Sequence, residues 1–190
     1  DVTTDPEERR RCLTFAVVGA GATGVELVGA MRGLIHGTLA RQYPRIHPGE
    51  TRLVLFEAMP DMLPGLPREL ADYARRRLQE LGVEVCLSSP VEAVHPDGVQ
   101  IKGGEFLPAR TVIWTAGVRP SPVAERLNVP RLQNGRILVD EYLQVRNVDD
   151  CFALGDIAAF IDPETQKPLP PNAAVAVRQG KALADIILAR

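Results

Sequence analysis

The stretch Gly19-Ala20-Gly21-Ala22-Thr23-Gly24 decides the fold of this chain, because it joins a short apolar run, Leu13 to Val18, to a segment with helical periodicity. Glycines at these spacings allow a tight turn at Gly19, close approach of a ligand to the backbone at Gly21, and close packing of helix on strand at Gly24. A helix N-terminus adds unpaired N–H groups and partial positive charge. The stretch therefore predicts a turn that cradles phosphate.

The residues that follow predict a parallel sheet. A helix is expected from Thr23 to about Gln42, since apolar residues recur at the spacing of one helix face. Buried strands are expected over Thr51–Glu57 and Val83–Leu87, with a helix over Pro67–Leu81 between them that stops at Gly82. This is the β-α-β-α-β order of a nucleotide-binding fold with right-handed crossovers.

The pattern of apolar residues changes after this β-α-β-α-β unit. Short runs at Val91–Ala93, Val99–Ile101 and Phe106–Leu107 are separated by glycine-containing turns, which predicts an antiparallel meander in place of the next helix. Thr111–Thr115 again has the composition of a buried strand, and Ala116-Gly117 follows it as a turn. We expect an α/β fold, a Rossmann-like parallel sheet with a β-meander crossover.

The remaining residues do not close a second nucleotide fold by themselves. They contain apolar runs at Ile137–Asp140 and Cys151–Leu154 and a helical stretch from Ala173 to Leu188. The expected organisation is a connecting segment over residues 1–12, a dinucleotide-binding domain over 13–119, and an incomplete part of another domain over 120–190. The absence of an initiator Met before Asp1 indicates a piece of a longer protein.

Composition narrows the function classes. The 190 residues are 45% hydrophobic with a net charge of -2, so nothing favours a nucleic-acid partner. No apolar stretch approaches the roughly 18 residues of a membrane span, so membrane contact would be peripheral or lie elsewhere. Cys12, Cys86 and Cys151 are far apart in sequence, which favours buried thiols in a reducing compartment and predicts neither a redox pair nor a metal site.

Two acidic residues accompany the glycine turn. Glu57 ends the second strand, where a carboxylate can accept hydrogen bonds from both ribose hydroxyls of an adenosine and repel a 2′-phosphate, so NADH is the predicted ligand. Glu57 stands further from Gly24 than the usual ~20 residues, because the intervening helix and loop are long. The alternative is that Glu57 only caps the strand end in solvent. Glu26, in the first turns of the helix, could also be there only for the helix dipole.

A family resemblance rests on these motifs together. The glycine turn with Glu26, then Leu55-Phe56-Glu57-Ala58 and Thr115-Ala116-Gly117, resembles the NADH domain of the two-dinucleotide-binding flavoprotein reductases, the pyridine nucleotide-disulfide oxidoreductase superfamily. Asp150-Cys151-Phe152-Ala153-Leu154-Gly155-Asp156 is similar to the element that completes their FAD site. Within that superfamily, the insertion with His36, Tyr43 and Pro44, the turn Asp61-Met62-Leu63-Pro64 and the segment Pro170-Pro171-Asn172-Ala173 look most like type II NADH dehydrogenases.

The resemblance implies roles for individual residues. NADH would contact Gly19, Gly21, Ala22, Thr23, Gly24, Glu57, Ala116 and Gly117, and FAD would contact Gly155, Asp156, Asn172 and Ala173. Glu26 would lie on the nicotinamide side and Gln179 on the quinone and flavin side. The family's other helix glutamines are replaced here by Ala174 and Arg178. The alternatives are that Asp156 is a turn carboxylate and that the last helix is an ordinary buried helix packed through Ala173, Ala176, Val177 and Leu183.

The implied reaction is hydride transfer from NADH to FAD, followed by electron transfer to a quinone, with no metal. Since no second glycine turn occurs in the chain, the resemblance implies that an N-terminal half of the FAD domain is missing, as is a membrane-contacting C-terminal segment. The resemblance implies that the full protein is cytoplasmic and peripheral on the inner face of the cell membrane. It also allows a homodimer. The open alternatives are a reductase whose acceptor is ferredoxin, a disulfide or oxygen, and a non-catalytic NADH-binding redox sensor.

Overall fold

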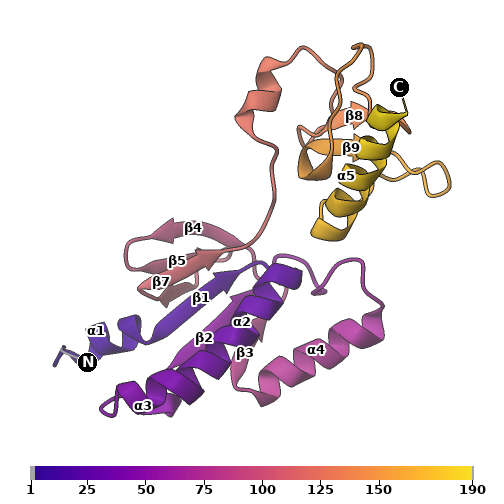
Figure 1. Ribbon diagram of the computed structural model, residues 1–190. Coiled ribbons are helices and arrows are strands. Elements are labelled where there is room, and N and C mark those ends of the chain that lie inside the picture. The colour runs from indigo at the N-terminus through magenta and orange to yellow at the C-terminus, as the bar shows by residue number, and fades with distance from the viewer. Residues whose placement is uncertain (1–2, 190) are drawn as a thin grey trace. The chain divides into compact units, whose positions relative to one another are not determined.

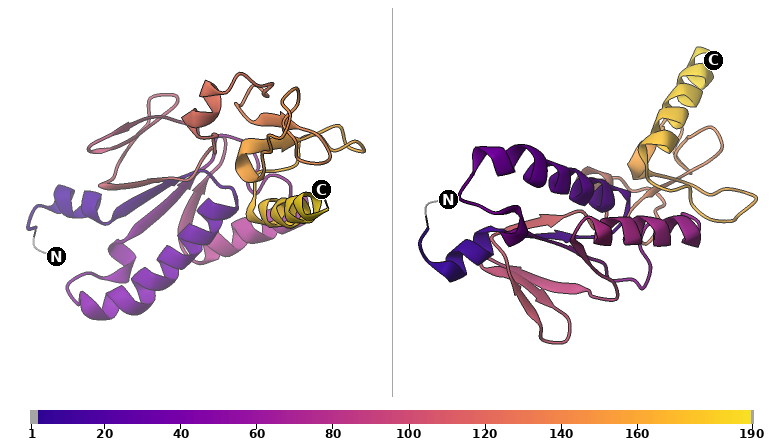
Figure 2. Two further views of the ribbon diagram at one scale, coloured as in Figure 1. Left: turned by 45° about the horizontal axis from the view of Figure 1, so that its top comes forward. Right: turned by 90° about the horizontal axis from the view of Figure 1, so that it is seen from below.

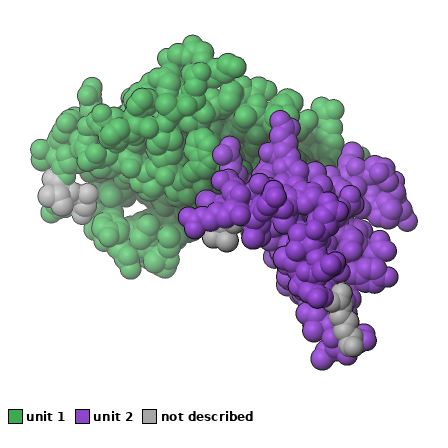
Figure 3. Space-filling model, turned by 90° about the horizontal axis from the view of Figure 1, so that it is seen from above, with its two compact units in different colours: residues 1–117 green, residues 118–190 purple. Residues whose placement is uncertain are grey.

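The computed structural model describes residues 3–189, apart from the side chain of Val123. The chain divides into two compact units, Asp1–Gly117 and Val118–Arg190, which Figure 3 distinguishes by colour. Each unit is described separately below. Figure 1 labels most of the helices and strands of both.

The first unit is built on a parallel sheet of four strands. Its order is β3-β2-β1-β7, with the glycine-turn strand β1 inside the sheet. The strands are β1 Thr14–Val18, β2 Arg52–Phe56, β3 Val83–Cys86 and β7 Thr111–Trp114. Val18, the last residue of β1, pairs with Phe56 of β2 and Trp114 of β7, so three strands end together beside the glycine turn. The predicted parallel fold is confirmed.

Helices cover one face of this sheet and a meander covers the other (Figure 2). The helical layer contains α2 Ala22–Leu34, η1 Ile35–Leu39, α3 Ala40–Gln42 and α4 Arg68–Glu80, with the short turn η2 Pro48–Glu50 in the loop before β2. The meander contains the antiparallel strands β4 Val91–His95, β5 Gly98–Ile101 and β6 Phe106–Pro108. It takes the position that a crossover helix has in a regular doubly wound sheet, as predicted.

The side chains that alternate along the strands contribute to two separate hydrophobic cores, one on each face of the sheet. Val17 and Leu55 point toward the helices and pack with Val28 and Leu78. Their neighbours Ala16, Val54 and Phe56 pack against the meander residues Val99, Ile101 and Leu107. Because successive side chains of a strand point to opposite faces, continuous apolar runs are needed where both faces are covered.

Two helical features of this unit were not predicted. Residues 6–12, expected to be only a connection, form the helix α1 Pro6–Cys12, with Pro6 at its first turn and the Asp5 side chain accepting the Glu7 N–H. The long helix predicted from Thr23 to Gln42 is continuous, but its middle part η1 is π-helical, and the Ala40 N–H bonds the Ile35 carbonyl. A π-helical turn holds one more residue than an α-helical turn.

The second unit has a two-stranded parallel sheet of β8 Ile137–Val139 and β9 Ala158–Phe160. It also has the short helices η3 Pro122–Arg126 and η4 Gly155–Ile157 and the long helix α5 Ala173–Leu188. The apolar run Cys151–Leu154 forms no strand, although an isolated bridge joins Phe152 to Gln144 and backbone hydrogen bonds join Cys151 to Val145 and Ala153 to Leu143. The core of this unit contains Ile137, Val139, Ala158 and Leu183.

Helix α5 is mostly exposed. Among its described residues only Gln179 and Leu183 are buried, while Ala173 is exposed and Val177 is 58% exposed. Of the four residues through which the alternative packs this helix, Leu183 is buried and Ala176 is partly buried, whereas Ala173 and Val177 are exposed.

Candidate dinucleotide-binding site

The glycine turn connects β1 to α2 at the carboxyl end of the sheet. Gly19 has φ +106°, a left-handed conformation that side chains rarely adopt, and its N–H donates to the Phe56 carbonyl at 2.8 Å. A Cβ added to Gly24 would lie 1.9 Å from the Gly19 carbonyl oxygen. These two glycines are therefore required by the turn itself, which folds the start of α2 directly onto the end of β1.

Gly21 needs a different explanation. Its φ of -71° suits any residue, and apart from its chain neighbours and its own helix backbone, no described residue lies within 4 Å of a Cβ built there. Gly21 is also the N-cap of α2, so the first N–H groups of this helix receive no side-chain cap. Open space, uncapped donors and the helix dipole together fit a phosphate that approaches the backbone from outside. The turn therefore has room for the pyrophosphate of a dinucleotide.

The end of β7 closes the other side of the turn. The Thr115 hydroxyl contacts the carbonyl oxygens of Val18 and Gly19 at 2.9 and 3.0 Å. A Cβ on Gly19 would meet the Ala116 backbone nitrogen at 2.8 Å, so Ala116 lies directly against the turn. Gly117 follows with φ +76°. No sequence pattern predicts the Thr115 contact, which depends on β7 pairing with β1 after a long excursion of the chain.

Glu57 lies beside the same turn, immediately after β2. Its carboxylate accepts the Ala20 N–H at 2.8 Å through one oxygen and the Met59 N–H at 3.0 Å through the other. The side chain is therefore held against the glycine turn instead of pointing freely into solvent. It also lines a pocket of about 360 Å³ whose other walls include Met62, Leu63 and Arg68.

The loop that forms this pocket is attached to the turn. The Leu63 N–H donates to the Ala20 carbonyl at 2.8 Å, and the Ser88 N–H donates to the Met59 carbonyl at 3.0 Å. Ala20 thus receives a contact through each of its backbone polar groups, from Glu57 and from Leu63. The geometry allows one ligand to contact the uncapped helix and the Glu57 pocket together.

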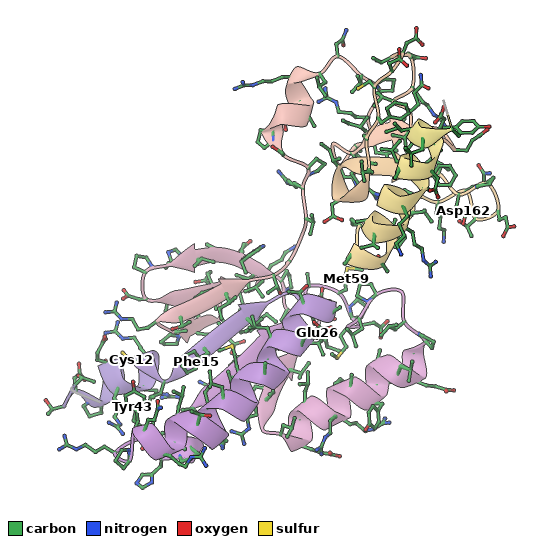
Figure 4. The ribbon with its side chains drawn as sticks, in the orientation of Figure 1. Cys12, Phe15, Glu26, Tyr43, Met59 and Asp162 are labelled. Atoms are coloured by element: carbon green, nitrogen blue, oxygen red, sulfur yellow. The ribbon has the colours of Figure 1, made fainter. Side chains whose placement is uncertain are left out.

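Glu26 lies on the exposed side of α2 near its first turn, as Figure 4 shows. Ala22 and Thr23 begin this helix and are exposed as well. Within residues 3–189, no group of three or more His, Cys, Asp or Glu side chains is arranged to hold a metal ion. None of the described helices has the length and hydropathy that a membrane span requires.

The predicted FAD residues lie in the second unit, where one of them, Gly155, contacts Gln179, the residue predicted on the quinone and flavin side. Gly155 has φ +70°, and its N–H donates to the carboxamide oxygen of Gln179 at 2.7 Å. Gln179 is only 7% exposed, so this buried side chain fastens the Gly155–Ile157 turn to α5. Asp156, the next residue, is exposed on the turn.

A buried cation lies close to Asp156. Arg136 is 5% exposed, and its guanidinium donates to the carbonyl oxygens of Ala158 and Leu169. Burial lowers the pKa of Arg136 from its ordinary value, while the negative charge of Asp156 acts to raise it. The side chain connects β9 to the loop before α5, and no sequence pattern predicts its burial.

Asn172 has a clear local role. Its side-chain oxygen accepts the Val175 N–H at 2.9 Å and so caps the N-terminus of α5. Ala173, the first residue of the helix, is exposed. The N-terminus of α5 is therefore capped by the chain's own side chain, unlike that of α2.

Comparison with known proteins agrees with this geometry. The chain is 35% identical to the internal alternative NAD(P)H-ubiquinone oxidoreductase A1, mitochondrial, of Solanum tuberosum over 95% of its length, and 37% identical to the type II NADH:quinone oxidoreductase NdhA of Mycobacterium tuberculosis over 99%. It spans 36% and 40% of those two proteins. The solved structure of NDH2 from Plasmodium falciparum in complex with NADH matches with a TM-score of 0.77 at 22% identity, covering 85% of this chain and 35% of that one, which supports the fold.

A family model extends across both units. The model described as pyridine nucleotide-disulphide oxidoreductase matches residues 3–180. This match includes the glycine turn, Glu57, the Thr115-Ala116-Gly117 segment and the Gly155–Gln179 contact. The chain belongs to the pyridine nucleotide-disulphide oxidoreductase family.

Proposed function

We propose that this chain is the NADH-binding part, and the second part of the FAD site, of a type II NADH dehydrogenase that passes electrons on to a quinone. The observation that carries the proposal is the pairing of Gly21, which has open space at its Cβ position at an uncapped helix, with the Glu57 carboxylate fixed beside it. The names of the similar NADH:quinone oxidoreductases support the choice of reaction.

In this proposal the glycine turn binds the pyrophosphate of NADH. The N–H groups of Ala22, Thr23 and Gly24 face the phosphate oxygens, and Gly21 allows the approach. Glu57 accepts hydrogen bonds from the adenosine ribose hydroxyls with the lone pairs that Ala20 and Met59 leave free. A 2′-phosphate meets electrostatic repulsion there, which favours NADH over NADPH.

The other predicted residues bind or orient the two cofactors. Ala116, Gly117 and Glu26 border the nicotinamide half of NADH, while Gly155, Asp156, Asn172 and Ala173 contribute to the FAD site. When bound, the cofactors supply hydride transfer from nicotinamide to flavin and onward electron transfer. Gln179 keeps the Gly155 turn fixed on α5 and borders the flavin and quinone side.

The proposal extends to the setting of the complete protein. We infer a cytoplasmic enzyme that is peripheral on the inner face of the cell membrane, since its quinone acceptor would be dissolved in the membrane. We infer separately that the complete protein forms a homodimer. Flotation of the complete protein with vesicles and its mass in solution test these two statements separately.

Titration of the 190-residue chain with NADH and NADPH tests the nucleotide assignment. Trp114, the chain's single tryptophan, ends β7 beside the turn, so its fluorescence should report binding. We expect NADH to bind at least about tenfold more tightly than NADPH, and Glu57→Gln to remove most of the difference. Glu92→Gln, on an exposed position of β4, is the matched control. Equal affinities in the unmodified chain would overturn the role of Glu57.

The acceptor is tested in the complete protein. NADH should bleach its flavin absorbance, and a soluble quinone should restore it in repeated turnovers. Preferred turnover with ferredoxin, a disulfide or oxygen would assign the related reductase instead. A protein that carries no flavin and still binds NADH would support a redox-sensing module.

A further inference from the structure

A second pocket lies in the first unit, at the end of the sheet away from the glycine turn. Its volume is about 170 Å³, and its walls include Leu13, Phe15, Ile35, Leu39, Tyr43 and Ile46. Figure 4 shows Phe15 and Tyr43 at the far end of the α2 to α3 helix from Glu26. The dinucleotide therefore leaves this pocket unexplained, because ligands of open parallel sheets bind at the carboxyl ends of the strands.

The lining of this pocket is almost entirely apolar. No charged side chain takes part, and the only hydroxyl-bearing residues are Tyr43 and Thr51. The Thr51 hydroxyl already donates to the Pro48 carbonyl at 2.7 Å. A pocket of this composition offers a water molecule too few polar partners, so it favours an apolar occupant.

One wall of the pocket is the π-helical segment. Ile35, Leu39 and Ala40 all line the pocket, and the Ala40 N–H bonds the Ile35 carbonyl across the extra residue. Such single turns inside α-helices are frequent at functional sites. Here the π-helical turn presents both its first and its last residue to the pocket.

The opposite wall is the loop from Tyr43 to Thr51, which is fixed from outside. Arg9 of α1 binds the Glu50 carboxylate through two nitrogens, at 2.7 and 3.2 Å, and donates to the Arg45 carbonyl at 2.7 Å. Glu50 in turn accepts the His47 N–H at 2.9 Å. These contacts attach the loop to α1 through residues that lie outside the pocket lining.

We propose that this pocket binds a small apolar molecule, a single aromatic ring with a short alkyl substituent. The volume is close to the roughly 150 Å³ of an enclosed apolar cavity that accepts benzene, but this pocket is open to solvent, since its lining residue Tyr43 is 45% exposed. Phe15 and Tyr43 place two aromatic side chains in the lining, and because aromatic rings pair favourably with one another, the lining favours an aromatic ligand over a linear chain. The site is separate from the proposed dehydrogenase chemistry and does not depend on it.

Toluene is the probe that tests this site in the 190-residue chain. We expect saturable chemical-shift changes in the methyl groups of Ile35, Leu39 and Ile46, and an increase in the melting temperature with toluene concentration. Ala40→Leu should fill the pocket and weaken toluene binding at least about tenfold without lowering the melting temperature. Ala30→Leu, on an exposed position of the same helix, is the matched control and should bind toluene normally.

Three results would overturn the proposal. The first is the absence of saturable shifts up to the solubility limit of toluene. The second is an unchanged toluene affinity in Ala40→Leu, checked in Leu39→Phe if the first variant does not fold. The third is tighter binding of n-octane than of toluene, which would assign a linear chain. Binding of NADH should be the same in all variants, so failure here leaves the proposed function unaffected.

Discussion

Gly21 and Gly24 stand three residues apart in one turn, yet their surroundings differ. A Cβ on Gly24 would overlap the Gly19 carbonyl at 1.9 Å, whereas a Cβ on Gly21 meets nothing within 4 Å. We expect Gly24→Ala to lower the free energy of unfolding by about 1–3 kcal/mol, since the turn must move. We expect Gly21→Ala to change it by less than about 1 kcal/mol and to weaken NADH binding about tenfold or more.

Urea denaturation and NADH titration of both variants check this prediction. A destabilised Gly21→Ala variant would show that the glycine serves the fold, and unchanged NADH affinity would remove the turn from the proposed site. The contrast matters because sequence patterns assign both glycines to one motif and cannot separate the two reasons for their presence.

Gln179 offers a second residue-scale prediction. Its buried carboxamide oxygen accepts the Gly155 N–H, so Gln179→Leu leaves this partly buried donor without a partner. The expected loss is about 1–3 kcal/mol of unfolding free energy, together with faster hydrogen exchange of the Gly155 amide. Lys181→Leu, an exposed position two residues along α5, is the control. Unchanged exchange at Gly155 would contradict the contact.

At the scale of elements, α1 and the loop before β2 are joined by the Arg9–Glu50 clamp. The hydrogen bond from Arg9 lowers the pKa of Glu50 from 4.5 to about 2. A carboxylate with a lowered folded-state pKa stabilises the protein above its unfolded pKa, and that stability disappears as the pH falls. We therefore expect the melting temperature to decrease between pH 4.5 and pH 2, and Glu50→Gln to show a weaker decrease.

Melting curves at stepped pH values measure this effect, with Glu92→Gln as a variant that keeps the clamp. A pH profile in Glu50→Gln identical to that of the unmodified chain would contradict the role of Glu50. Because both side chains are partly exposed, added salt should also weaken the effect.

The helices and strands of the first unit could mostly be predicted from the sequence, because the patterns that identify them lie within each element. The apolar runs of β1, β2 and β3, the Pro67 and Gly82 boundaries of α4, and the turn-separated runs of the meander each identify an element. The π-helical turn and α1 were not predicted, since their residues also suit a regular helix and a polar connection. In the second unit, β9 has only the three residues Ala158–Phe160, too few for a periodic pattern.

Some contacts of the candidate site could likewise be predicted from local sequence signals, and others could not. The glycine turn and Glu57 were predicted to lie together, because parallel strands bring their carboxyl ends to one edge. The contacts of Thr115 with Gly19 and of Gln179 with Gly155 join residues 96 and 24 positions apart. Such pairs depend on tertiary packing, and no spacing within the sequence encodes them.

For the whole molecule, the two units have separate cores, and the described parts of the predicted NADH site all belong to the first. We expect residues 1–117 alone to fold cooperatively and to bind NADH within about threefold of the affinity of the 190-residue chain. Trp114 fluorescence and thermal unfolding measure both properties. A shortened chain that folds but does not bind NADH would show that the second unit contributes to the site.

Glu57 has a structural role and a proposed role in coenzyme preference, and both depend on the same carboxylate. Its carboxylate holds the amides of Ala20 and Met59 in place, and in our proposal it also rejects NADPH. Replacing it with a small or basic residue to accept NADPH would also release those amides. Any change of coenzyme preference at this position is therefore coupled to weaker anchoring of the glycine turn, and a successful redesign needs a compensating substitution that restores an acceptor for Ala20.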